Sequence, residues 1–403
     1  MIGGTRSYEF GKRLANNGHE VHIITSDLTG ISKAKSRWTT EKIDGMTIHW
    51  LNCHYANDMG FYRRIWAFMY FAIHTSMKGL QIKGDLVFAT STPLTIAIPG
   101  IFLSKLKRMP MVFEVRDLWP ELPIAIGALN NPVLKYLARK LEKIAYASSE
   151  CVIALSPGMK AGVIATGYDS NRVAVIPNSS DDYFKNPDPQ KIDSFRQQRA
   201  WLDNGPLVVY TGTFGKINGV GYLVELAAAV KKINANINFL IVGGGMEFEE
   251  VKNKAIKYDV LDDNVHIESA LKKNDVPVVL SLATVATSLF IDLPEMGSNS
   301  ANKFFDALAS GTPVFINYGG WQHELVTTNN LGLAVKGMTI PMAAQTLCDF
   351  LQNENQLKIS STEASRVARD LFNRDLLAVK FQSILEAGYS KQGDSANTFS
   401  YSA

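Results

Sequence analysis

"VATSLFIDLPEMGSNSANKFFDALASGTPVFIN" (285–317) contains a complete strand–helix–strand pattern, and this pattern indicates the fold class. The runs "VATSLF" (285–290) and "TPVFIN" (312–317) are short, apolar and rich in β-branched residues, so both are predicted to be buried strands. Between them, "NKFFDALA" (302–309) has the apolar spacing of a helix, and Gly311 is a good helix stop. A strand, a helix and a strand in this order form a parallel βαβ unit, which predicts an α/β protein.

The same alternation of strands and helices runs through both halves of the chain. It predicts two doubly wound, Rossmann-like domains that face each other across a cleft. A polar, proline-bearing stretch separates the halves, so we place domain 1 at 1–182 and domain 2 at 183–372, with a disordered tail at 390–403. The other predicted strands are 21–26, 46–51, 85–90, 111–115, 151–155 and 173–177 in the first half, and 207–212, 237–245, 264–269 and 332–337 in the second.

Composition excludes several classes of protein. The chain has 403 residues, 46% of them hydrophobic and 20% charged, and a formal net charge of +3, which is too small an excess for a nucleic-acid-binding protein. Cys53, Cys151 and Cys348 lack metal-ligand spacing, and the last two lie in apolar runs typical of buried thiols in a reducing compartment. No apolar run reaches the ~20 residues of a membrane span. These features favour a cytoplasmic protein.

The loop before residue 302 is rich in backbone donors and leads into a helix at the carboxyl end of a predicted strand. Ligands of open α/β sheets bind there, and the free N–H groups of a first helical turn favour an anion. Lys303 opposes the helix dipole unless a bound diphosphate lies beside it, with Ser300 and Asn302 nearby. One turn on, Asp306 suits the two hydroxyls of a ribose. The alternative for Lys303 is that the loop only caps the helix and the lysine is solvated. The alternative for Asp306 is an exposed charge on the helix surface.

A second glycine cluster, "YTGTFGKINGVGYL" (210–223), follows the first strand of domain 2, where a phosphate-binding turn belongs. Glycine patterns of this kind are common, and the case depends on the proximity of the neighbouring strand end that carries the lysine. A third turn, "IVGGGME" (241–247), either binds ligand or only permits tight packing. The residues of the second cluster that we expect to bind the phosphate-bearing ligand are Gly212, Gly215, Lys216 and Asn218.

In domain 1, charged residues gather in "FEVRDLWPELP" (113–123), where another strand ends. Arg116 and Asp117 are candidates for transferring a proton or for orienting an acceptor, the substrate that receives a transferred group. Asp117, Trp119 and Glu121 are candidates for binding that acceptor. The alternative is a local ion pair that stiffens the turn.

The stretch "FYRRIWAFMYFAIHTSM" (61–77) is apolar over most of its surface and has Arg63 and Arg64 at its start. It is short for a membrane span, and it either lies in a membrane interface or is a buried helix of domain 1. Basic residues in 103–110 would support the same surface.

The start of the chain departs from a complete doubly wound domain. Gly3 and Gly4 read as the glycine turn that follows a first strand, and residues 5–16 as the helix after it, but no strand precedes them. We therefore expect the first strand of domain 1 to lie upstream of Met1, and expect poor folding if Met1 is the true start.

Several stretches taken together resemble the GT-B glycosyltransferases of family 4, in particular a WbuB-like subgroup of O-antigen and capsule sugar transferases. In order, they include "EVRDLWPE", "VIPNSSD", "YTGTFGKINGVGYLVE", "IVGGGMEFEE" and "NKFFDALASGTPVF". The resemblance implies a donor bound mainly by the second domain, an acceptor bound by the first, and a C-terminal helix (373–389) that returns to the first. It also implies retention of anomeric configuration, with no cofactor and no required metal.

The resemblance also implies roles for particular residues. Asp306 matches the acid expected on the donor ribose, and Arg116 and Asp117 fall where many members have a histidine near the sugar. The first acid of the family's acid pair would fall at Ser298, which is not acidic. The positions that match residues near the donor diphosphate are Gly3, Gly4, Lys216 and Lys303.

The expected reaction is transfer of a sugar from a nucleoside diphosphate sugar to a lipid-diphosphate-linked or glycan acceptor in surface polysaccharide synthesis. The donor is expected to be UDP-linked and to carry an N-acetylated or deoxy sugar. Such an enzyme would lie in the cytoplasm, with peripheral contact to the inner face of the membrane through residues 61–77. The alternatives are a sugar-nucleotide 2-epimerase of the same architecture and an inactive binding subunit of a polysaccharide assembly complex.

Overall fold

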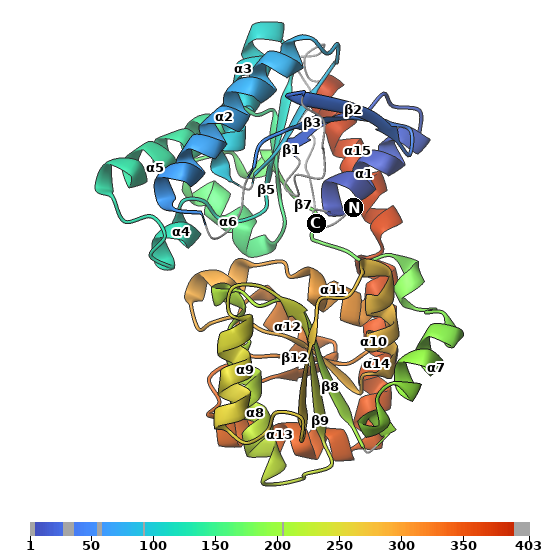
Figure 1. Ribbon diagram of the computed structural model, residues 1–403. Coiled ribbons are helices and arrows are strands. Elements are labelled where there is room, and N and C mark those ends of the chain that lie inside the picture. Colours follow the sequence, from blue (N-terminus) through green and yellow to red (C-terminus); the bar gives the residue numbers. More distant parts are fainter. Residues whose placement is uncertain (1–4, 27–35, 55–58, 92, 204, 391–403) are drawn as a thin grey trace. The chain divides into compact units, whose positions relative to one another are not determined.

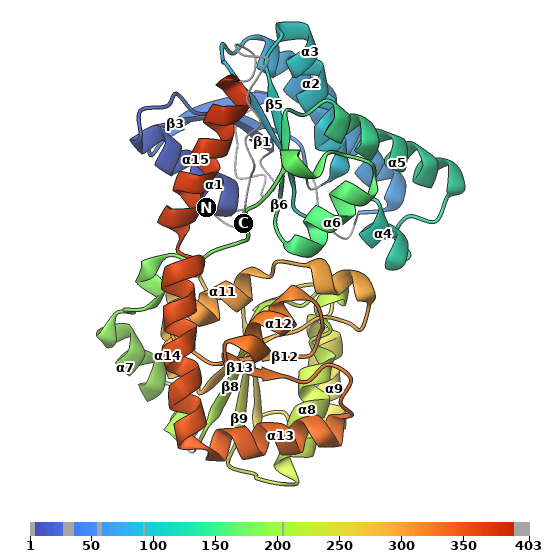
Figure 2. The ribbon, with the colours of Figure 1, turned by 180° about the vertical axis from the view of Figure 1, so that it is seen from behind.

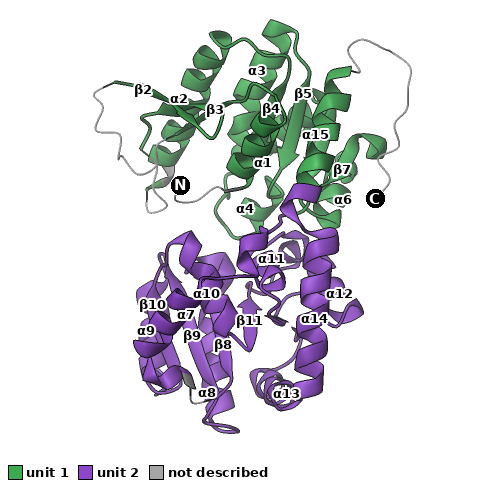
Figure 3. Cartoon of the chain, turned by 90° about the vertical axis from the view of Figure 1, so that its right-hand side faces the viewer, with its two compact units in different colours: residues 1–177, 377–403 green, residues 178–376 purple. Residues whose placement is uncertain are grey.

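The computed structural model describes residues 5–26, 36–54, 59–91, 93–203 and 205–390. The chain divides into unit 1, residues 1–177 with 377–403, and unit 2, residues 178–376 (Figure 3). The predicted boundary near residue 182 thus falls inside unit 2. Residues 178–181 belong to unit 2 because they bond to it, as in the 2.6 Å hydrogen bond from Asn178 Nδ2 to Ser300 O.

Unit 2 is built around a six-stranded sheet in which every pairing is parallel, in the order β10-β9-β8-β11-β12-β13. The first strand, β8, is central, and the strand order reverses between β8 and β11. Loops diverge at such a reversal and leave a crevice outside the carboxyl ends of the strands. The strands are β8 (Leu207–Thr213), β9 (Asn238–Gly244), β10 (Val265–Ser269), β11 (Val285–Ser288), β12 (Val314–Ile316) and β13 (Gly332–Ala334).

Helices cover both faces of this sheet (Figure 1). One face packs on α8, α9 and α13, and Val208, Phe239 and Phe315 are fully buried in that core. On the other face lie α10, α11 and α14 (Figures 1 and 2). The helices of unit 2 are α7 (Pro189–Gln197), α8 (Gly221–Lys231), α9 (Phe248–Lys257), α10 (Val276–Leu282), α11 (Asn302–Ala309), α12 (Trp321–Thr328), α13 (Ile340–Gln352) and α14 (Glu354–Leu371).

The described strands of unit 1 form two sheets. One is parallel, in the order β4-β5-β6-β7, and the other has the order β1-β3-β2, with β1 parallel and β2 antiparallel to β3. Gly3 and Gly4 lie outside the described residues, as does the tail from residue 391. The strands are β1 (His22–Ser26), β2 (Trp38–Ile43), β3 (Met46–Leu51), β4 (Val87–Ser91), β5 (Met111–Val115), β6 (Cys151–Ala154) and β7 (Val173–Val175).

Strand β2 is an element that the sequence analysis missed. It pairs with β3 through a hairpin whose two central residues, Asp44 and Gly45, have φ values of 48° and 80°. Two consecutive positive φ angles define the tight turn that Asp-Gly pairs favour. The Asp-Gly pair before a β-branched run was therefore the signal that could have predicted this hairpin.

The helices of unit 1 include the last helix of the chain. Helix α15 packs against α1, where the rings of Phe10 and Phe381 stack with centroids 4.7 Å apart (Figures 1 and 2). Among the described helices, none is both long and apolar enough to cross a membrane. Cys151 and Cys348 are buried and unoxidised, as predicted. The helices are α1 (Thr5–Asn16), α2 (Phe61–Leu80), α3 (Ala97–Lys107), α4 (Glu121–Ala125), α5 (Pro132–Ala147), α6 (Pro157–Ala165) and α15 (Arg374–Ser390).

Candidate functional site

The candidate site lies at the carboxyl ends of β8 and β11 in unit 2. These strands are direct neighbours, with Val208 opposite Val285. After β8 the chain makes a short 3₁₀ turn (Lys216–Asn218) before α8, and after β11 it runs through a loop into α11 at Asn302. The glycine-rich loop after β8 and the serine-containing loop before α11 therefore both lie where the strand order reverses. Ligands of such sheets bind at this point.

Lys303, in the first turn of α11, is the central charge of this site. Its Nζ donates to Asn218 Oδ1 at 2.7 Å and to Tyr210 Oη at 3.3 Å. It also lies 4.8 Å from the ring centroid of Tyr210 and 5.5 Å from that of Phe290. All these partners are neutral, and no carboxylate of the described residues pairs with Lys303.

The surroundings of Lys303 favour a bound anion. Its side chain is partly buried, and loss of hydration lowers its pKa from the ordinary value of 10.5 to about 7. The dipole of α11 adds positive potential at the same place. A negatively charged ligand would stabilise the protonated amine and use the free N–H groups of the helix start.

The acceptors around Lys303 are held in place by the loop after β8. Asn218 Nδ2 donates to Thr213 O at 3.0 Å, which turns its Oδ1 toward the amine. Tyr210 Oη donates to the same carbonyl at 2.8 Å, so its lone pairs remain for Lys303. A Cβ added to Gly212 would come within 3.2 Å of Tyr210 Oη and 3.6 Å of Lys303 Cε. A side chain at this position would therefore crowd the Tyr210 hydroxyl that accepts from Lys303, and glycine avoids this.

The predicted proximity of the glycine loop and the lysine is thus confirmed: Gly212, Asn218 and Lys303 lie together. Asp306 and Ser300 instead contact residues 178–180. Ser180 Oγ donates to Asp306 Oδ1 at 2.9 Å, and Asn178 donates to Ser300 through its backbone N (3.1 Å, to Oγ) and its Nδ2 (2.6 Å, to O). Burial raises the pKa of Asp306 to about 6, and the hydrogen bond from Ser180 opposes that rise.

The remaining donor-side candidates lie around this cluster. The side chain of Asn302 is exposed at the first position of α11, and Gly215 precedes the 3₁₀ turn. Lys216 is exposed and acts electrostatically on Glu247, whose pKa is raised by burial and lowered by the lysine.

The third glycine turn has a packing role in the structure. A Cβ on Gly243 would lie 1.8 Å from Gly212 O, and one on Gly245 would lie 2.5 Å from Phe214 O. Side chains at these positions would collide with the backbone of the loop after β8. These glycines therefore support the candidate site by allowing the two loops to pack closely.

The acceptor-side candidates follow β5 in unit 1. The backbone N of Arg116 donates to Ser91 Oγ at 3.2 Å, and Asp117 is the next residue. Trp119 packs against the core under β5. Glu121, in the first turn of α4, pairs with Arg139 of α5 at 3.1 Å. The ion pair of Glu121 is therefore made with a different helix.

A buried ion pair in unit 1 was missed at the sequence level. Arg6 Nε donates to Glu114 Oε1 at 2.8 Å, and the two side chains are only 2% and 1% exposed. Arg6 also donates to the carbonyls of Pro177 and Ile176, and Thr90 Oγ1 donates to Glu114 Oε2 at 2.7 Å. The signal was the glutamate inside the otherwise apolar strand "MVFEV".

Fold and site together define a two-unit α/β protein with a partly buried lysine at the switch point of its second sheet. Two family models match the chain: a glycosyl transferase 4-like domain over residues 3–179 and a glycosyl transferases group 1 domain over residues 191–367. The chain therefore carries a glycosyl transferase 4-like domain followed by a glycosyl transferases group 1 domain, in the two-domain Rossmann-like architecture of the GT-B fold.

Known proteins resemble it over most of its length. It is 22% identical over 328 residues to a GDP-mannose-dependent α-(1-6)-phosphatidylinositol monomannoside mannosyltransferase of Mycobacterium tuberculosis, covering 78% of this chain and 79% of that one. A sucrose-phosphate synthase of Thermosynechococcus elongatus superposes with a TM-score of 0.76 at 18% identity, covering 96% and 94%. The Anabaena protein Alr3699/HepE, solved with UDP and glucose, superposes with a TM-score of 0.70 at 14% sequence identity. The match covers 96% of this chain and 97% of that one.

Proposed function

We propose that this glycosyltransferase uses a UDP-linked sugar as donor and binds its diphosphate at Lys303. The observation that carries the proposal is a partly buried cation at a helix start whose partners are all neutral. A diphosphate would supply the missing negative charge. The mannosyltransferase relative is named for GDP-mannose and the HepE structure holds UDP, which supports a nucleoside diphosphate in this fold.

Other residues complete the donor site in this proposal. Asp306 would accept hydrogen bonds from the ribose hydroxyls, replacing the one that Ser180 now donates. The backbone of Ser300 and Asn302 would donate to phosphate oxygens at the start of α11, and Lys216 would add charge from the other loop.

The reaction we propose proceeds with retention of anomeric configuration. The acceptor hydroxyl oxygen forms a bond to the anomeric carbon on the face from which the diphosphate leaves. The bond between the anomeric carbon and the diphosphate oxygen breaks. The hydroxyl proton passes to the leaving phosphate oxygen, so no strong protein base is required. Negative charge grows on that phosphate, and Lys303, Lys216 and the α11 N-terminus stabilise it. Arg116 and Asp117 would orient the acceptor.

We further propose a lipid-diphosphate-linked or glycan acceptor in surface polysaccharide synthesis, reached at the inner face of the cytoplasmic membrane. The WbuB-like motifs support this setting. The name of the mannosyltransferase relative, which includes a phosphatidylinositol mannoside, supports a lipid acceptor.

A panel of UDP- and GDP-linked sugars tests the proposal, with release of the nucleoside diphosphate as the readout. We expect release from a UDP-linked sugar, stimulated by a lipid-diphosphate acceptor, and an NMR spectrum of the product showing the anomeric configuration of the donor. Lys303→Ala and Asp306→Ala should abolish release. Conversion of the donor to its 2-epimer without acceptor would instead identify an epimerase. Binding without release from any donor would identify an inactive binding subunit.

A further inference from the structure

Helix α2 exposes an apolar stripe along its whole length. Tyr62 and Trp66 are 85% and 72% exposed, and further apolar side chains follow at helical spacing. At 100° per residue, they fall within a stripe about 80° wide. The exposed residues of the stripe are Tyr62, Trp66, Met69, Ile73, Met77 and Leu80. Away from this stripe, the side chains of Ala72 and Thr75 are buried and anchor α2 to unit 1.

The apolar exposure continues onto the neighbouring helices. Helix α3 packs between α2 and α5, with direct contacts to both. Isolated apolar side chains on a surface are ordinary, but a contiguous set across adjacent helices marks an interaction surface. The exposed apolar and aromatic residues of α3 and α5 are Phe102, Leu106, Val133, Tyr136, Leu137 and Ile144.

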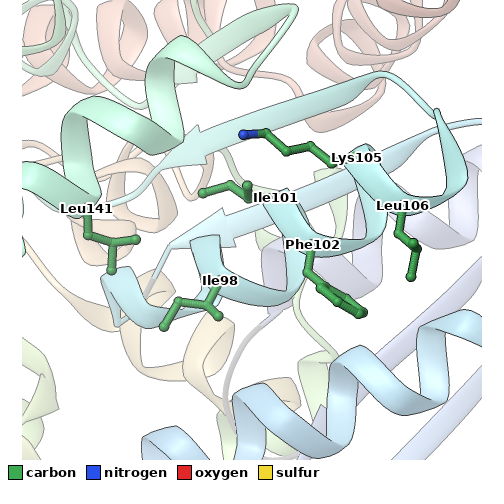
Figure 4. A pocket seen from close by; sticks show the side chains of 6 residues that line it. All are labelled: Ile98, Ile101, Phe102, Lys105, Leu106 and Leu141. Atoms are coloured by element: carbon green, nitrogen blue, oxygen red, sulfur yellow. The ribbon is translucent and has the colours of Figure 1, made fainter.

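The surface of α3 is hollowed where it meets α5. The hollow is open and about 570 Å³ in volume, and it is lined by five side chains from α3 and one from α5. Figure 4 shows these lining side chains. Apart from one lysine the lining is apolar, so the hollow suits a hydrocarbon chain with a negatively charged head near the amine. The lining residues are Ile98, Ile101, Phe102, Lys105, Leu106 and Leu141.

The charge of this region is strongly one-sided. Residues 59–109 contain seven lysines and arginines but a single acidic residue, Asp85, whereas the whole chain carries only +3. Helix α5 adds four basic residues, and its only acid, Glu142, is buried. Apolar and aromatic side chains flanked by basic ones are the pattern of a surface that inserts shallowly into an anionic bilayer.

We propose that α2, α3 and α5 form a docking face for anionic lipid bilayers, with the stripe of α2 inserted at the headgroup level and the α3–α5 hollow holding a lipid hydrocarbon chain. This docking face rests on the proposed function, because its purpose would be to bring the enzyme to a lipid-linked acceptor. Such an acceptor is presented at a bilayer surface. The sequence predicted membrane contact through residues 61–77 alone. The proposed face adds α3 and α5 to that contact and specifies an anionic lipid bilayer as the partner.

Co-sedimentation of the full chain with vesicles tests this docking face. Binding to phosphatidylglycerol vesicles is expected, with much weaker binding to phosphatidylcholine vesicles and a loss of affinity at high salt. The double variant Trp66→Ser/Ile73→Ser should bind about tenfold more weakly. The double variant Phe102→Ser/Leu106→Ser should show a similar loss, because it opens the hollow.

A matched control removes equally exposed apolar side chains from unit 2. Met246 and Ile256 are 68% and 57% exposed, against 72% for Trp66 and 54% for Ile73. Met246→Ser/Ile256→Ser should leave vesicle binding unchanged. Equal loss in test and control variants would overturn the proposal, as would wild-type binding independent of lipid charge, or self-association of the chain that the test variants abolish.

Donor binding is measured on the same preparations without vesicles. Vesicle binding by a chain that binds neither UDP nor any UDP-linked sugar of the panel would refute the proposed donor while leaving the docking face intact. UDP-glucose binding by a chain that ignores phosphatidylglycerol vesicles would refute the docking face alone. Retained UDP-glucose binding by the serine variants shows that they are folded.

Discussion

Arg6 in unit 1 and Lys303 in unit 2 are both cationic side chains withdrawn from water, but their partners differ. Arg6 donates to the carboxylate of Glu114 and to two backbone carbonyls. Lys303 donates to an amide oxygen and a phenol oxygen and lies over two aromatic rings. The first charge is neutralised by the fold, and the second is not.

This difference separates a structural charge from a binding charge. A buried ion pair whose polar atoms are all bonded holds elements together, here α1 to β5 and to residues 176–177. A desolvated cation with neutral partners costs free energy in the unliganded protein, as the lowered pKa of Lys303 indicates. That cost is recovered when an anion binds.

The largest effect is expected from breaking the structural pair. Arg6→Met should lower the free energy of unfolding by about 3–5 kcal/mol, because it leaves the carboxylate of Glu114 buried without its cation. Urea unfolding of the full chain measures this change. As the control, Arg139→Met removes the partner of Glu121 from an exposed pair and should leave the midpoint nearly unchanged. Equal loss in both variants would contradict the structural role of Arg6.

The next largest effect is expected at Lys303, where a substitution should weaken ligand binding but should not reduce stability. Lys303→Met should weaken UDP-glucose binding about 100-fold, since a charge-assisted contact to the diphosphate is lost. Isothermal titration measures the affinity.

The same variant should not be destabilised. The folded-state pKa of Lys303, about 7, lies below its unfolded value, so folding disfavours the charged form at any pH below that unfolded value. At pH 6.5 the thermal midpoint of unliganded Lys303→Met should therefore be unchanged or higher. The exposed Lys232→Met serves as the control for both measurements. A large loss of stability in Lys303→Met would mean that the lysine is structural, like Arg6.

A third variant turns the binding charge into a structural one. Asn218→Asp would place a carboxylate 2.7 Å from Lys303 Nζ, as in the pair of Arg6 with Glu114. We expect the pKa of Lys303 to rise, because its amine gains an anionic partner. UDP-glucose affinity should fall about tenfold because the carboxylate competes with the diphosphate. Isothermal titration measures the affinity, and unaltered affinity would contradict the assignment.

Much of the fold could be predicted from the sequence because its strands are local signals. β-Branched runs such as "VATSLF" and the helix that starts at Asn302 are confirmed within a few residues. The closeness of Gly212 and Lys303 was also predictable, since loops at the carboxyl ends of neighbouring parallel strands meet.

The partners of individual side chains could not be predicted, because they come from distant parts of the chain. Ser180 and Asp306 are 126 residues apart, and Arg6 and Glu114 are 108 apart. Hydrophobic periodicity gives no information on such pairs. The hairpin at Asp44 is different, since its Asp-Gly signal was present and local.

The affinity for UDP-glucose as a function of pH, between 6.5 and 9, tests the central claim most directly. Asp306, with a pKa of about 6, is mostly ionised across this range, and the diphosphate keeps its charge. If the ligand binds protonated Lys303, affinity should be nearly constant below pH 7 and fall up to about tenfold per pH unit above it. Lys303→Arg, which stays charged, should bind with a flat profile. A flat wild-type profile, or the same decline in the arginine variant, would contradict the assignment of Lys303 as the diphosphate-binding charge.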